Sequence, residues 1–551
     1  MNFLERIFER LDESGGATVV QEIRGQQLVP ASGDELLSLV AKVRGFLTAT
    51  GLRKGDRCAL LAPNSIRWVA ADLALMTNGV IVVPLYVRQA PAELATMVRD
   101  SGASRILCES QQTCDALRNA DRDMPPISLF EEAFAHGGTI SHVSSEFSPR
   151  DPVTIIYTSG TSGEPKGVVL NIGNVDHMIS CTTASLDKLM GAQSALDRVF
   201  HWTPLNFAAS WISLLSYLSR SSVISLSTDL TKLADEMRIA APNYFLNVPT
   251  LLERVRTKIE GQIRERGGWI AATFSKAKYA YLCRGTNDAS FSDRICLAIA
   301  NVLIFPTIRK SIGSRLKALI CGSAPLSVET QKFFMMLGIP VLQAYGLTET
   351  TAICTLDDPA LVEPGYVGAA IPGIEMKVGE NQEILVRGPN VFPGYWNRPQ
   401  ETAAVIRDGW FHSGDQGEVN SRGNWKITGR IKNLIILNSG HNIAPEPIEE
   451  ELAALLPQAA QIVVVGNGRS YLAAIITTEA NSNLTESEIS TAVDKVNSRL
   501  PHYKQIRAFH LERQPFTIES GLLTAMGKLK RDAIAAKMSN QIEELYRKRV
   551  A

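Results

Sequence analysis

The stretch VTIIYTSGTSGEPKGVVL, residues Val153–Leu170, sets a loop rich in glycine and hydroxyl groups between two apolar runs. The run Val153–Tyr157 is β-branched and aromatic and predicts a buried strand, and Val168–Leu170 predicts a second one. Between them lie four hydroxyl residues, three glycines and Lys166. Backbone N–H groups in such a loop can point at an anion, and the lysine adds a compact positive charge. The stretch therefore predicts a tight connection between two strands that binds a polyphosphate.

The spacing of this loop excludes two well-known phosphate and nucleophile loops. A P-loop needs GxxxxGK followed by Ser or Thr, whereas Lys166 follows Pro165 and precedes Gly167. A hydrolase elbow needs GxSxG, and Ser162 is followed by Gly163 and Glu164. Taken alone, a loop of this composition is most often a flexible connector.

Composition limits the class of protein. The 551 residues allow roughly two to four domains of ~150 residues each, and 45% apolar residues are ordinary for a globular chain. The 56 basic and 56 acidic residues balance, so nothing global indicates nucleic acid as a partner. The eight cysteines form no CxxC pair, which argues against a zinc site or a disulfide framework and favours a reducing cytoplasm. We expect no signal peptide, and no apolar run reaches the ~18 residues of a membrane helix.

The pattern of helices and strands changes twice along the chain. From Glu35 to about Ile320, helical patterns alternate with short β-rich runs, which predicts a largely parallel sheet covered by helices. These runs are Cys58–Ala62, Val80–Leu85, Arg105–Cys108, Thr154–Tyr157, Val223–Leu226 and Ala318–Cys321. After Gly365, short strands between turns predict a small antiparallel β subdomain. An α+β unit is expected from about Gly429, with strands Gln461–Val465 and Tyr471–Thr477 and helices from Glu486 onward.

Residues 251–317 form a basic segment, with 13 basic residues against 5 acidic ones. One interpretation is a solvated helical face, which is what most charge runs are. The other interpretation is a surface that contacts anionic lipid or a phosphorylated ligand, which would place the protein peripherally at a membrane.

The run YTSGTSGEPKGVV resembles the phosphate-loop signature of the adenylate-forming superfamily, which includes acyl-CoA synthetases, luciferases and peptide-synthetase adenylation domains. Further segments that resemble motifs of this family follow in its order. They are Gly322–Leu326, Ala344–Thr350 (its YGxTE motif), Gly388–Trp396, Trp410–Asp415, Gly429–Lys432 and Met526–Arg531 (its SGKIxR lysine motif). The resemblance covers nearly the entire chain, and several motifs in order are far more specific than one.

The resemblance implies an α/β fold class with two domains. Residues 1–430 would form a large N-terminal domain of helix-covered sheets with a small β-barrel subdomain. Residues 431–551 would form a small, mobile α+β domain hinged at Lys432.

The resemblance also implies a site for ATP or AMP. Its residues would be Thr158, Ser159, Gly160, Thr161, Ser162, Gly163 and Lys166 at the β- and γ-phosphates; Gly322, Ser323, Ala324, Pro325, Ala344, Tyr345 and Gly346 around the adenine; Thr348 at the α-phosphate; and Asp415 and Arg430 at the ribose. Glu349 would bind Mg²⁺, since a carboxylate is the oxygen ligand that this ion prefers.

The chemistry of such a site is the activation of a carboxylic acid. Attaching AMP turns a carboxylate oxygen into a phosphate leaving group, and the approach of two anions needs charge neutralisation. The resemblance implies that Lys528 supplies this charge from the second domain. That domain would then swing about Lys432 and admit the thiol of coenzyme A along a channel lined by Ser439 and Gly440.

Two stretches, Asn438–Leu452 and Leu522–Ile534, look more like long-chain fatty acyl-CoA synthetases than like aryl or acetyl relatives. Phe207 stands where the family's PLxH pattern has histidine, so the environment of the carboxylate differs here. Trp211 matches an aromatic gate to the acyl tunnel of some long-chain members, or else it is a packed core tryptophan.

The expected substrates are therefore a fatty acid, ATP with Mg²⁺, and coenzyme A. The alternatives are a fatty acyl-AMP ligase or acyl-carrier-protein synthetase, which delivers its product to a carrier protein, and a non-catalytic nucleotide-binding relative. A luciferase-like oxygenase is compatible with the motifs, although no residue calls for it.

Overall fold

The computed structural model describes the chain apart from residues 139–146, 160–164, 192–195, 284–288, 480–481, 525–526 and 548–551. The chain forms two compact units. The first comprises Met1–Met376, Val386–Phe411 and Ser421–Trp425, and the second comprises Lys377–Leu385, His412–Asn420 and Lys426–Ala551.

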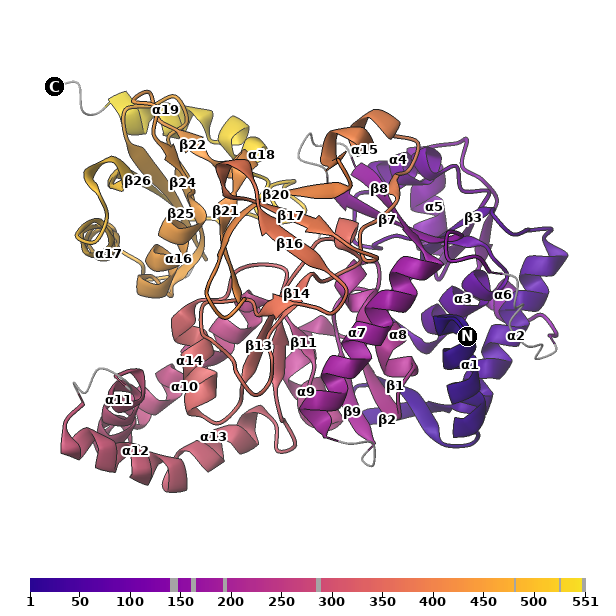
Figure 1. Cartoon of the computed structure of the whole chain (residues 1–551), viewed down its shortest axis with the longest axis horizontal. Coiled ribbons are helices and arrows are strands. Elements are labelled where there is room, and N and C mark those ends of the chain that lie inside the picture. Colours follow the sequence, from indigo (N-terminus) through magenta and orange to yellow (C-terminus); the bar gives the residue numbers. More distant parts are fainter. Residues whose placement is uncertain are drawn as a thin grey trace. The chain divides into compact units, whose positions relative to one another are not determined.

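A seven-stranded sheet lies in the N-terminal half of the first unit (Figure 1). In spatial order its strands are β18 (Gly394–Tyr395), β8 (Pro165–Asn171), β7 (Pro152–Ser159), β4 (Ile81–Pro84), β3 (Arg57–Leu61), β5 (Arg105–Cys108) and β6 (Ile127–Leu129). The pairings from β7 through β4, β3 and β5 to β6 are parallel, while β8 pairs antiparallel with both β7 and β18. The predicted largely parallel sheet is confirmed.

Helices cover this sheet, as apolar strands buried on both faces require. They include α2 (Gly33–Ala49), α3 (Ile66–Thr77), α4 (Pro91–Ser101) and α5 (Gln111–Ala120). Local signals set their ends: the Ser65 side chain accepts from the Trp68 N–H to cap α3, and Gly102, at φ 62°, ends α4 in the left-handed conformation.

Two further sheets complete the strand framework of the first unit. One has the order β2 (Gln27–Ser32), β1 (Thr18–Arg24), β10 (Ser222–Ser227), β9 (Asp197–His201). The other has the order β11 (Leu246–Asn247), β12 (Leu319–Cys321), β13 (Val341–Tyr345), β14 (Thr355–Leu356), β15 (Ala369–Ala370). The runs expected at Val223–Leu226 and Ala318–Cys321 are thus strands β10 and β12.

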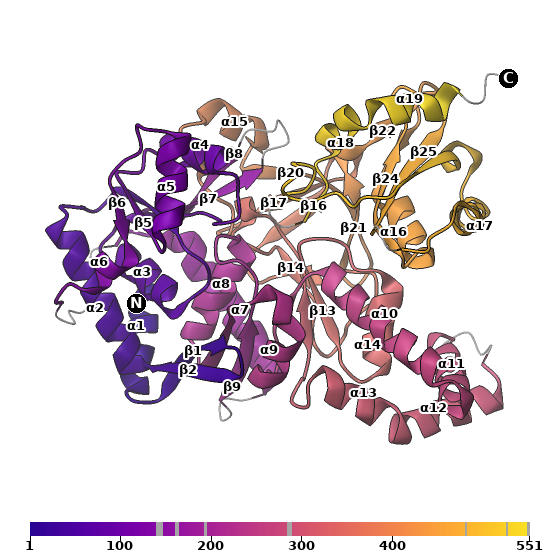
Figure 2. The same ribbon diagram turned by 180° about the vertical axis from the view of Figure 1, so that it is seen from behind.

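The basic segment is a group of helices within the first unit. They are α10 (Pro249–Arg266), α11 (Gly268–Leu282), α12 (Phe291–Leu303) and α13 (Phe305–Ile312), and α14 (Val328–Met336), which follows β12 beyond the segment, packs against α10 and α11. Figure 2 shows α11 and α12 at the end of this group that is farther from β13. Phe274, Phe305 and Phe333 form edge-to-face pairs in its core, where such pairs add to the burial energy.

Some cations of this segment are structural. Lys278 Nζ lies 2.7 Å from Glu260 Oε1 and 2.8 Å from Glu329 Oε1, and Arg256 contacts the same Glu329 oxygen at 2.8 Å.

Among the described residues, no single helix is long and apolar enough to cross a membrane; α12 and α13 pass that test only together, as a pair bent by 46°.

The strands after Gly365 form a smaller sheet whose residues are divided between the two units. Its order is β16 (Glu375–Val378), β17 (Glu383–Arg387), β20 (Trp410–Val419), β19 (Ile406–Arg407), with β21 (Trp425–Arg430) paired to β20. The pairing of β19 with β20 is antiparallel.

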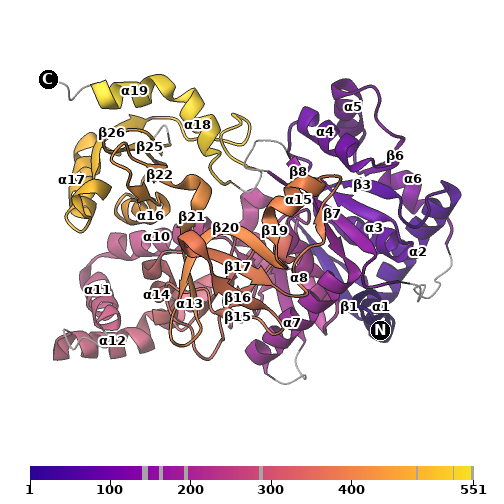
Figure 3. The same cartoon turned by 45° about the horizontal axis from the view of Figure 1, so that its top comes forward.

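The second unit also contains a three-stranded sheet with helices, in agreement with the predicted α+β arrangement (Figure 3). Its strands are β24 (Ala459–Val465), β25 (Leu472–Thr478) and β26 (Ile506–Glu512), and its helices are α16 (Glu446–Leu455), α17 (Glu486–Asn497), α18 (Arg531–Lys537) and α19 (Ser539–Arg547). Glu449 on α16 makes a two-pronged ion pair with Arg531, at 2.6 and 2.8 Å, and accepts from the Val464 N–H. This buried pair fixes the start of α18 against α16 and β24.

Trp211 lies in the core of the first unit, on α8 (Ala208–Leu218), with no exposed surface. Its indole N–H donates to Asp72 Oδ2 on α3 at 2.8 Å. Asp72 Oδ1 is buried and has no partner among the described residues. Burial raises the pKa of Asp72 to about 7, which favours the protonated carboxyl.

We expect Asp72→Asn to remove part of the pH dependence of folding. The ordinary pKa of 3.8 in the unfolded chain rises to about 7 on folding, so between these values the folded chain holds a proton that the unfolded chain has released. Stability from this group is therefore complete below about pH 4 and falls as the pH rises toward 7, by up to ~4 kcal/mol at ~1.4 kcal/mol per pKa unit. Urea unfolding across this pH range measures the slope.

Asp357 provides a matched second variant, because burial raises its pKa to about 7 as well. Asp357→Asn should remove the part of the pH dependence of the unfolding free energy that comes from Asp357. The double variant should remove the parts that come from both carboxyls. If Asp72→Asn keeps the full wild-type slope while Asp357→Asn loses part of it, Asp72 does not bind the extra proton.

Candidate active site

The opening stretch folds as a hairpin of two antiparallel strands, β7 and β8, as its apolar runs predict. Thr158 pairs with Lys166 and Ser159 pairs with Pro165 at the end of the ladder. Gly160, Thr161, Ser162 and Gly163 lie outside the described residues. The strands are confirmed, and phosphate binding by the loop stays a prediction.

Lys166 extends from β8 toward one side chain of β18, Tyr395, and one that follows this strand, Glu401. Its ammonium group forms an ion pair with Glu401, on the short helix α15 (Pro399–Val405), and lies 5.5 Å from the centre of the Tyr395 ring. Figure 3 shows α15 beside β8. The hydrogen bond from Lys166 lowers the pKa of Glu401, so this carboxylate remains charged opposite the lysine.

Tyr395 joins this lysine to Glu349. The Tyr395 hydroxyl donates to Glu349 Oε1 at 2.8 Å, and the Phe392 N–H donates to the Glu349 carbonyl oxygen at 2.9 Å. Burial, followed by the nearby charge of Glu349, raises the pKa of Tyr395, which keeps the hydroxyl protonated as the donor. The structure thus brings Lys166, Tyr395 and Glu349 together at the end of the hairpin.

Two buried asparagines hold the segment around Gly388–Trp396 in place. Asn174, at the start of α7 (Ile172–Met190), donates to the carbonyl oxygens of Pro389 and Val391. The Asn390 carbonyl accepts from the Thr351 hydroxyl at 2.7 Å, two residues beyond Glu349. Because the Trp396 N–H also donates to the Gly167 carbonyl, this segment connects the hairpin to the loop that carries Glu349.

The sequence marks Gly388–Trp396 as a family-like motif, but it assigns a contact to no residue in it. It did not single out Tyr395, Glu401 or Asn390. The motif itself is the sequence signal that could have pointed to Tyr395, because a tyrosine within a matched motif is a candidate for a functional hydrogen bond.

Glu349 is suited to magnesium as one ligand among several. Its carboxylate is half-buried, and one of its oxygens is oriented by the Tyr395 hydroxyl. No group of three or more His, Cys, Asp or Glu side chains that could hold a metal occurs in the described part of the chain. Mg²⁺ commonly binds with one or two carboxylates plus substrate phosphates, so the residues fit an ion that arrives with a nucleotide.

The two segments predicted to surround adenine follow neighbouring strands. Strands β12 and β13 are parallel, so Gly322–Pro325 and Ala344–Gly346 meet at the same edge of the sheet. A Cβ on Gly346 would lie 2.2 Å from the Ala352 carbonyl oxygen, and one on Gly322 would lie 3.2 Å from that of Ala344. Glycine is therefore required at position 346, whereas a Cβ at position 322 would make a tight contact that a small shift of Ala344 could relieve.

The two residues predicted at the ribose, both in the second unit, contact each other. Arg430 Nε lies 2.6 Å from Asp415 Oδ1, and Asp415 is buried whereas Arg430 is partly exposed. Glu383 shapes the turn before Asp415 by accepting from the Gly414 N–H at 3.0 Å and from His412 Nδ1 at 2.9 Å. Gly414 has φ 70°, a conformation that glycine adopts without strain.

Lys528 is exposed at a turn of the second unit. Its N–H donates to the Thr524 hydroxyl, its carbonyl accepts from the Thr524 N–H, and Leu523 bridges to Leu529 on either side. The Glu449–Arg531 ion pair anchors the end of this turn three residues later. The backbone of the turn is thus held while the lysine side chain reaches solvent.

The other predicted residues of the second unit are also at its surface. Lys432 is exposed in a single 3-10 turn, Ile431–Asn433. Ser439 and Gly440 lie in the exposed turn between β22 (Ile435–Ile436) and β23 (Asn442–Ile443), where the Ser439 hydroxyl lies 2.9 Å from His441 Nδ1. Their hinge and channel roles stay predictions.

Phe207 and Trp211 are the residues predicted at the acyl pocket. Phe207 is the N-cap of α8, and Trp211 lies near the start of this helix. Trp211 is the core tryptophan that donates to Asp72, and its role as a gate stays a prediction. The nearest histidine, His201, is also buried, with Nε2 2.9 Å from Ser210 Oγ, and burial lowers its pKa to about 4. It is therefore neutral near pH 7 and adds no positive charge in place of the histidine that Phe207 replaces.

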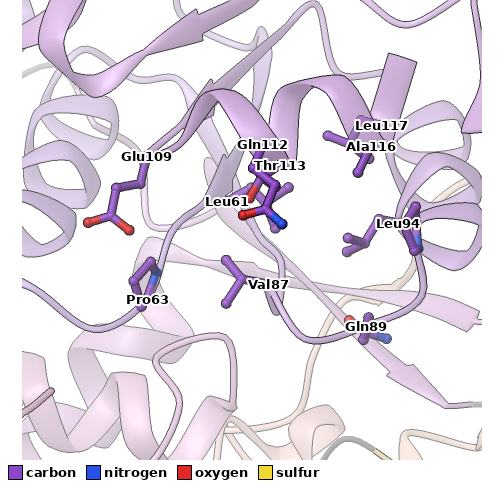
Figure 4. A pocket seen from close by; sticks show the side chains of 11 residues that line it. Leu61, Pro63, Val87, Gln89, Leu94, Glu109, Gln112, Thr113, Ala116 and Leu117 are labelled. Carbon is purple, nitrogen blue, oxygen red and sulfur yellow. The ribbon is translucent and has the colours of Figure 1, made fainter. Parts of the chain in front are cut away.

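A cavity of about 390 Å³ lies elsewhere in the first unit (Figure 4). Its lining residues belong to the region around β3, α4 and α5 and include Leu61, Val87, Leu94 and Glu109. None of the predicted site residues that the structure describes lines it.

Comparison with known proteins identifies the family. The family model described as AMP-binding enzyme matches residues 11–396, and the model of the AMP-binding enzyme C-terminal domain matches residues 432–550. Long-chain-fatty-acid–CoA ligase FadD15 of Mycobacterium bovis is 27% identical over 545 residues, with 91% of this chain and 90% of the relative covered. Putative fatty-acid–CoA ligase fadD11 of Mycobacterium tuberculosis is 32% identical over 436 residues, or 72% and 74% of the two chains.

A solved structure shows the same fold at lower identity. O-succinylbenzoate coenzyme A synthetase from Bacillus subtilis, in complex with ATP and a magnesium ion, superposes with a TM-score of 0.73. It is 21% identical, and the match covers 96% of this chain and 98% of that one. With family models that span most of its length, this chain belongs to the AMP-binding enzyme family, the adenylate-forming superfamily whose motifs it carries.

Proposed function

We propose that this protein is a long-chain fatty acid–CoA ligase. It activates a fatty acid as acyl-AMP with release of pyrophosphate, and it then transfers the acyl group to coenzyme A. The observation that carries the proposal is the cluster of Lys166, Tyr395 and Glu349 beside the hairpin that bears the phosphate-loop motif. Relatives named fatty-acid–CoA ligases, matched over most of the chain, support the acid and the thiol.

In the first half-reaction, ATP lies along the residues of the first unit. Thr158, Ser159 and the loop that follows hold the β- and γ-phosphates, with Lys166 exchanging Glu401 for a phosphate oxygen. Thr348 donates to the α-phosphate. Glu349, oriented by Tyr395, would hold Mg²⁺, and the ion would supply charge neutralisation at the phosphates. Adenine fits between the Gly322–Pro325 segment and Tyr345.

In the second unit, Asp415 and Arg430 bind the ribose and phosphate, as their paired geometry permits. We place the mobile domain at residues 431–551, with its hinge at Lys432. Lys528 neutralises the carboxylate and the α-phosphate as they approach. Ser439 and Gly440 then line the path of the coenzyme A thiol, and Phe207 and Trp211 border the acyl chain.

Pyrophosphate release across a panel of carboxylic acids, with and without coenzyme A, tests the function. Long-chain fatty acids should give the highest kcat/KM, and coenzyme A should convert the adenylate to a thioester. Adenylate that accumulates with coenzyme A present, and is released only to a carrier protein, would establish the acyl-AMP ligase instead. No pyrophosphate with any acid would contradict the proposal.

Lys166→Ala should raise the ATP concentration required for half-maximal rate by about ten- to a hundredfold. It removes a charge-assisted contact to phosphate, worth roughly 1.5–3 kcal/mol. Glu401→Gln should lower the ATP concentration required for half-maximal rate. In this variant Lys166 has no charged partner to give up before it binds phosphate. Steady-state kinetics with varied ATP measure both effects.

Lys188→Ala is the matched control, since Lys188 is an exposed cation on α7 that forms a 3.9 Å ion pair with Asp358. It should leave the ATP dependence unchanged. The phosphate assignment of Lys166 is wrong if a folded Lys166→Ala variant shows the same ATP dependence as this control.

Lys528 and Lys432 should affect opposite half-reactions. Lys528→Ala should lose ~10²–10³-fold in adenylation, the scale seen when one donor to transition-state charge is removed. Given preformed acyl-AMP and coenzyme A, this variant should make thioester at near wild-type rate. Lys432→Pro, which fixes φ at the proposed hinge, should accumulate adenylate and fail to form thioester.

Lys432→Ala, which keeps the backbone free, is the control and should retain both half-reactions. Rapid-quench experiments measure each half-reaction in the three variants. If the domain adopts two poses, Lys528→Ala should lose only adenylation and Lys432→Pro should lose only thioester formation. Equal losses in both halves for Lys528→Ala and Lys432→Pro would contradict the alternating-domain account.

A further inference from the structure

Helix α12 exposes large apolar side chains along one face. They are Phe291, Ile295, Ile299, Val302 and Leu303, which are 80, 44, 39, 72 and 60% exposed. At 100° per residue these positions fall within about one third of the helix circumference. Leu297 and Ala300, on the opposite side, are buried within the helical group of the first unit. α12 is therefore apolar on both faces, and only one of them is covered by the chain.

The neighbouring helix extends this apolar surface. α11, which packs on α12, exposes Trp269, Tyr279 and Leu282. Single exposed apolar residues are normal on proteins, whereas several on one helical layer indicate a surface that is covered by a partner. We call these eight residues of α11 and α12 the apolar face.

Basic residues dominate the charges around the apolar face. On α11, α12 and α13 the exposed cations are Lys276, Arg294, Arg309 and Lys310, and Asp293 is the single acidic residue of these three helices as described. Asp293 is engaged at the start of α12, where its carboxylate accepts from Ser290. Lys278 is engaged with Glu260 and Glu329. Basic residues thus outnumber acidic ones on these three helices as described.

We infer that the apolar face docks this protein on the surface of an anionic membrane, with α12 lying in the plane of the headgroups. An interfacial helix buries its apolar side chains at the headgroup boundary while nearby cations attract anionic lipid. α12 and α13 are joined with a 46° bend, which suits a pair that lies along the surface more than one that crosses it.

The charge pattern also selects this occupant over a second copy of the chain. Two copies paired through the apolar face would bring Lys276, Arg294, Arg309 and Lys310 of each close to the same cations of the other, with few acidic residues to compensate. Like charges opposed across an interface oppose association. An anionic lipid surface complements them.

Docking would serve the proposed function, because long-chain fatty acids partition into membranes, and this use of the surface rests on that function. The docking itself does not. It can be measured without ATP, acid or coenzyme A, so its failure and the failure of the ligase assignment are distinguishable.

Co-sedimentation of the full chain with vesicles tests the inference. Wild type should bind vesicles of phosphatidylcholine with about one third phosphatidylglycerol, and bind pure phosphatidylcholine vesicles at least tenfold more weakly. The triple variant Phe291→Gln, Val302→Gln, Leu303→Gln should lose binding to the anionic vesicles at least tenfold. Arg309→Gln with Lys310→Gln should weaken anionic binding and reduce its dependence on salt.

Leu28→Gln with Leu361→Gln, at exposed apolar positions outside the helical group, is the matched control and should bind as wild type. Thermal unfolding checks that the triple variant folds, which is expected because its positions are exposed. Wild type that stays in the supernatant with anionic vesicles overturns the inference, as does a folded triple variant that binds like wild type. A dimer of wild type in light scattering that the triple variant abolishes, without vesicle binding, overturns it in favour of self-association.

Discussion

The hydrogen bond from the Tyr395 hydroxyl to Glu349 is the constraint on which the first unit's site depends. It joins Tyr395 of β18 to Glu349, which lies in the loop after β13. Strands β18 and β13 belong to different sheets. Burial and the charge of Glu349 raise the pKa of the tyrosine and so keep its hydroxyl protonated as the donor. A carboxylate held in this way can ligate Mg²⁺ without first reorganising, which is how preorganised sites gain their electrostatic advantage.

The surrounding contacts maintain this constraint. Asn174 and Asn390 fix the backbone that leads into β18, and Trp396, which follows β18, ties it to the phosphate-loop hairpin. Lys166 lies over the ring of the same tyrosine and is neutralised by Glu401. Hydrogen bonds, an ion pair and a cation–ring contact thus connect the site to its scaffold, and the carboxylate of Glu401 balances the charge of Lys166.

Much of the fold could be predicted from local patterns. The apolar runs around Val153–Leu170 predicted β7 and β8, and the βα alternation predicted the parallel sheet, because side-chain period and turn residues act over a few positions. The motifs named most of the candidate residues. The contacts between them could not be predicted in this way, since Glu349 meets Tyr395, and Lys166 meets Glu401, across long stretches of chain. For the same reason the sequence could not decide whether Trp211 is a gate to the acyl tunnel or a core residue. The hydrogen bond to Asp72 shows how the side chain is held.

If Glu349, oriented by Tyr395, ligates magnesium, nucleotide binding should depend on this ion. Calorimetric titration of ATP into the protein, with and without Mg²⁺, measures that dependence without turnover. The account predicts that Mg²⁺ strengthens ATP binding to the wild type, that Glu349→Gln loses this strengthening at least tenfold, and that Tyr395→Phe loses part of it. Wild-type magnesium dependence in a folded Glu349→Gln variant would contradict it.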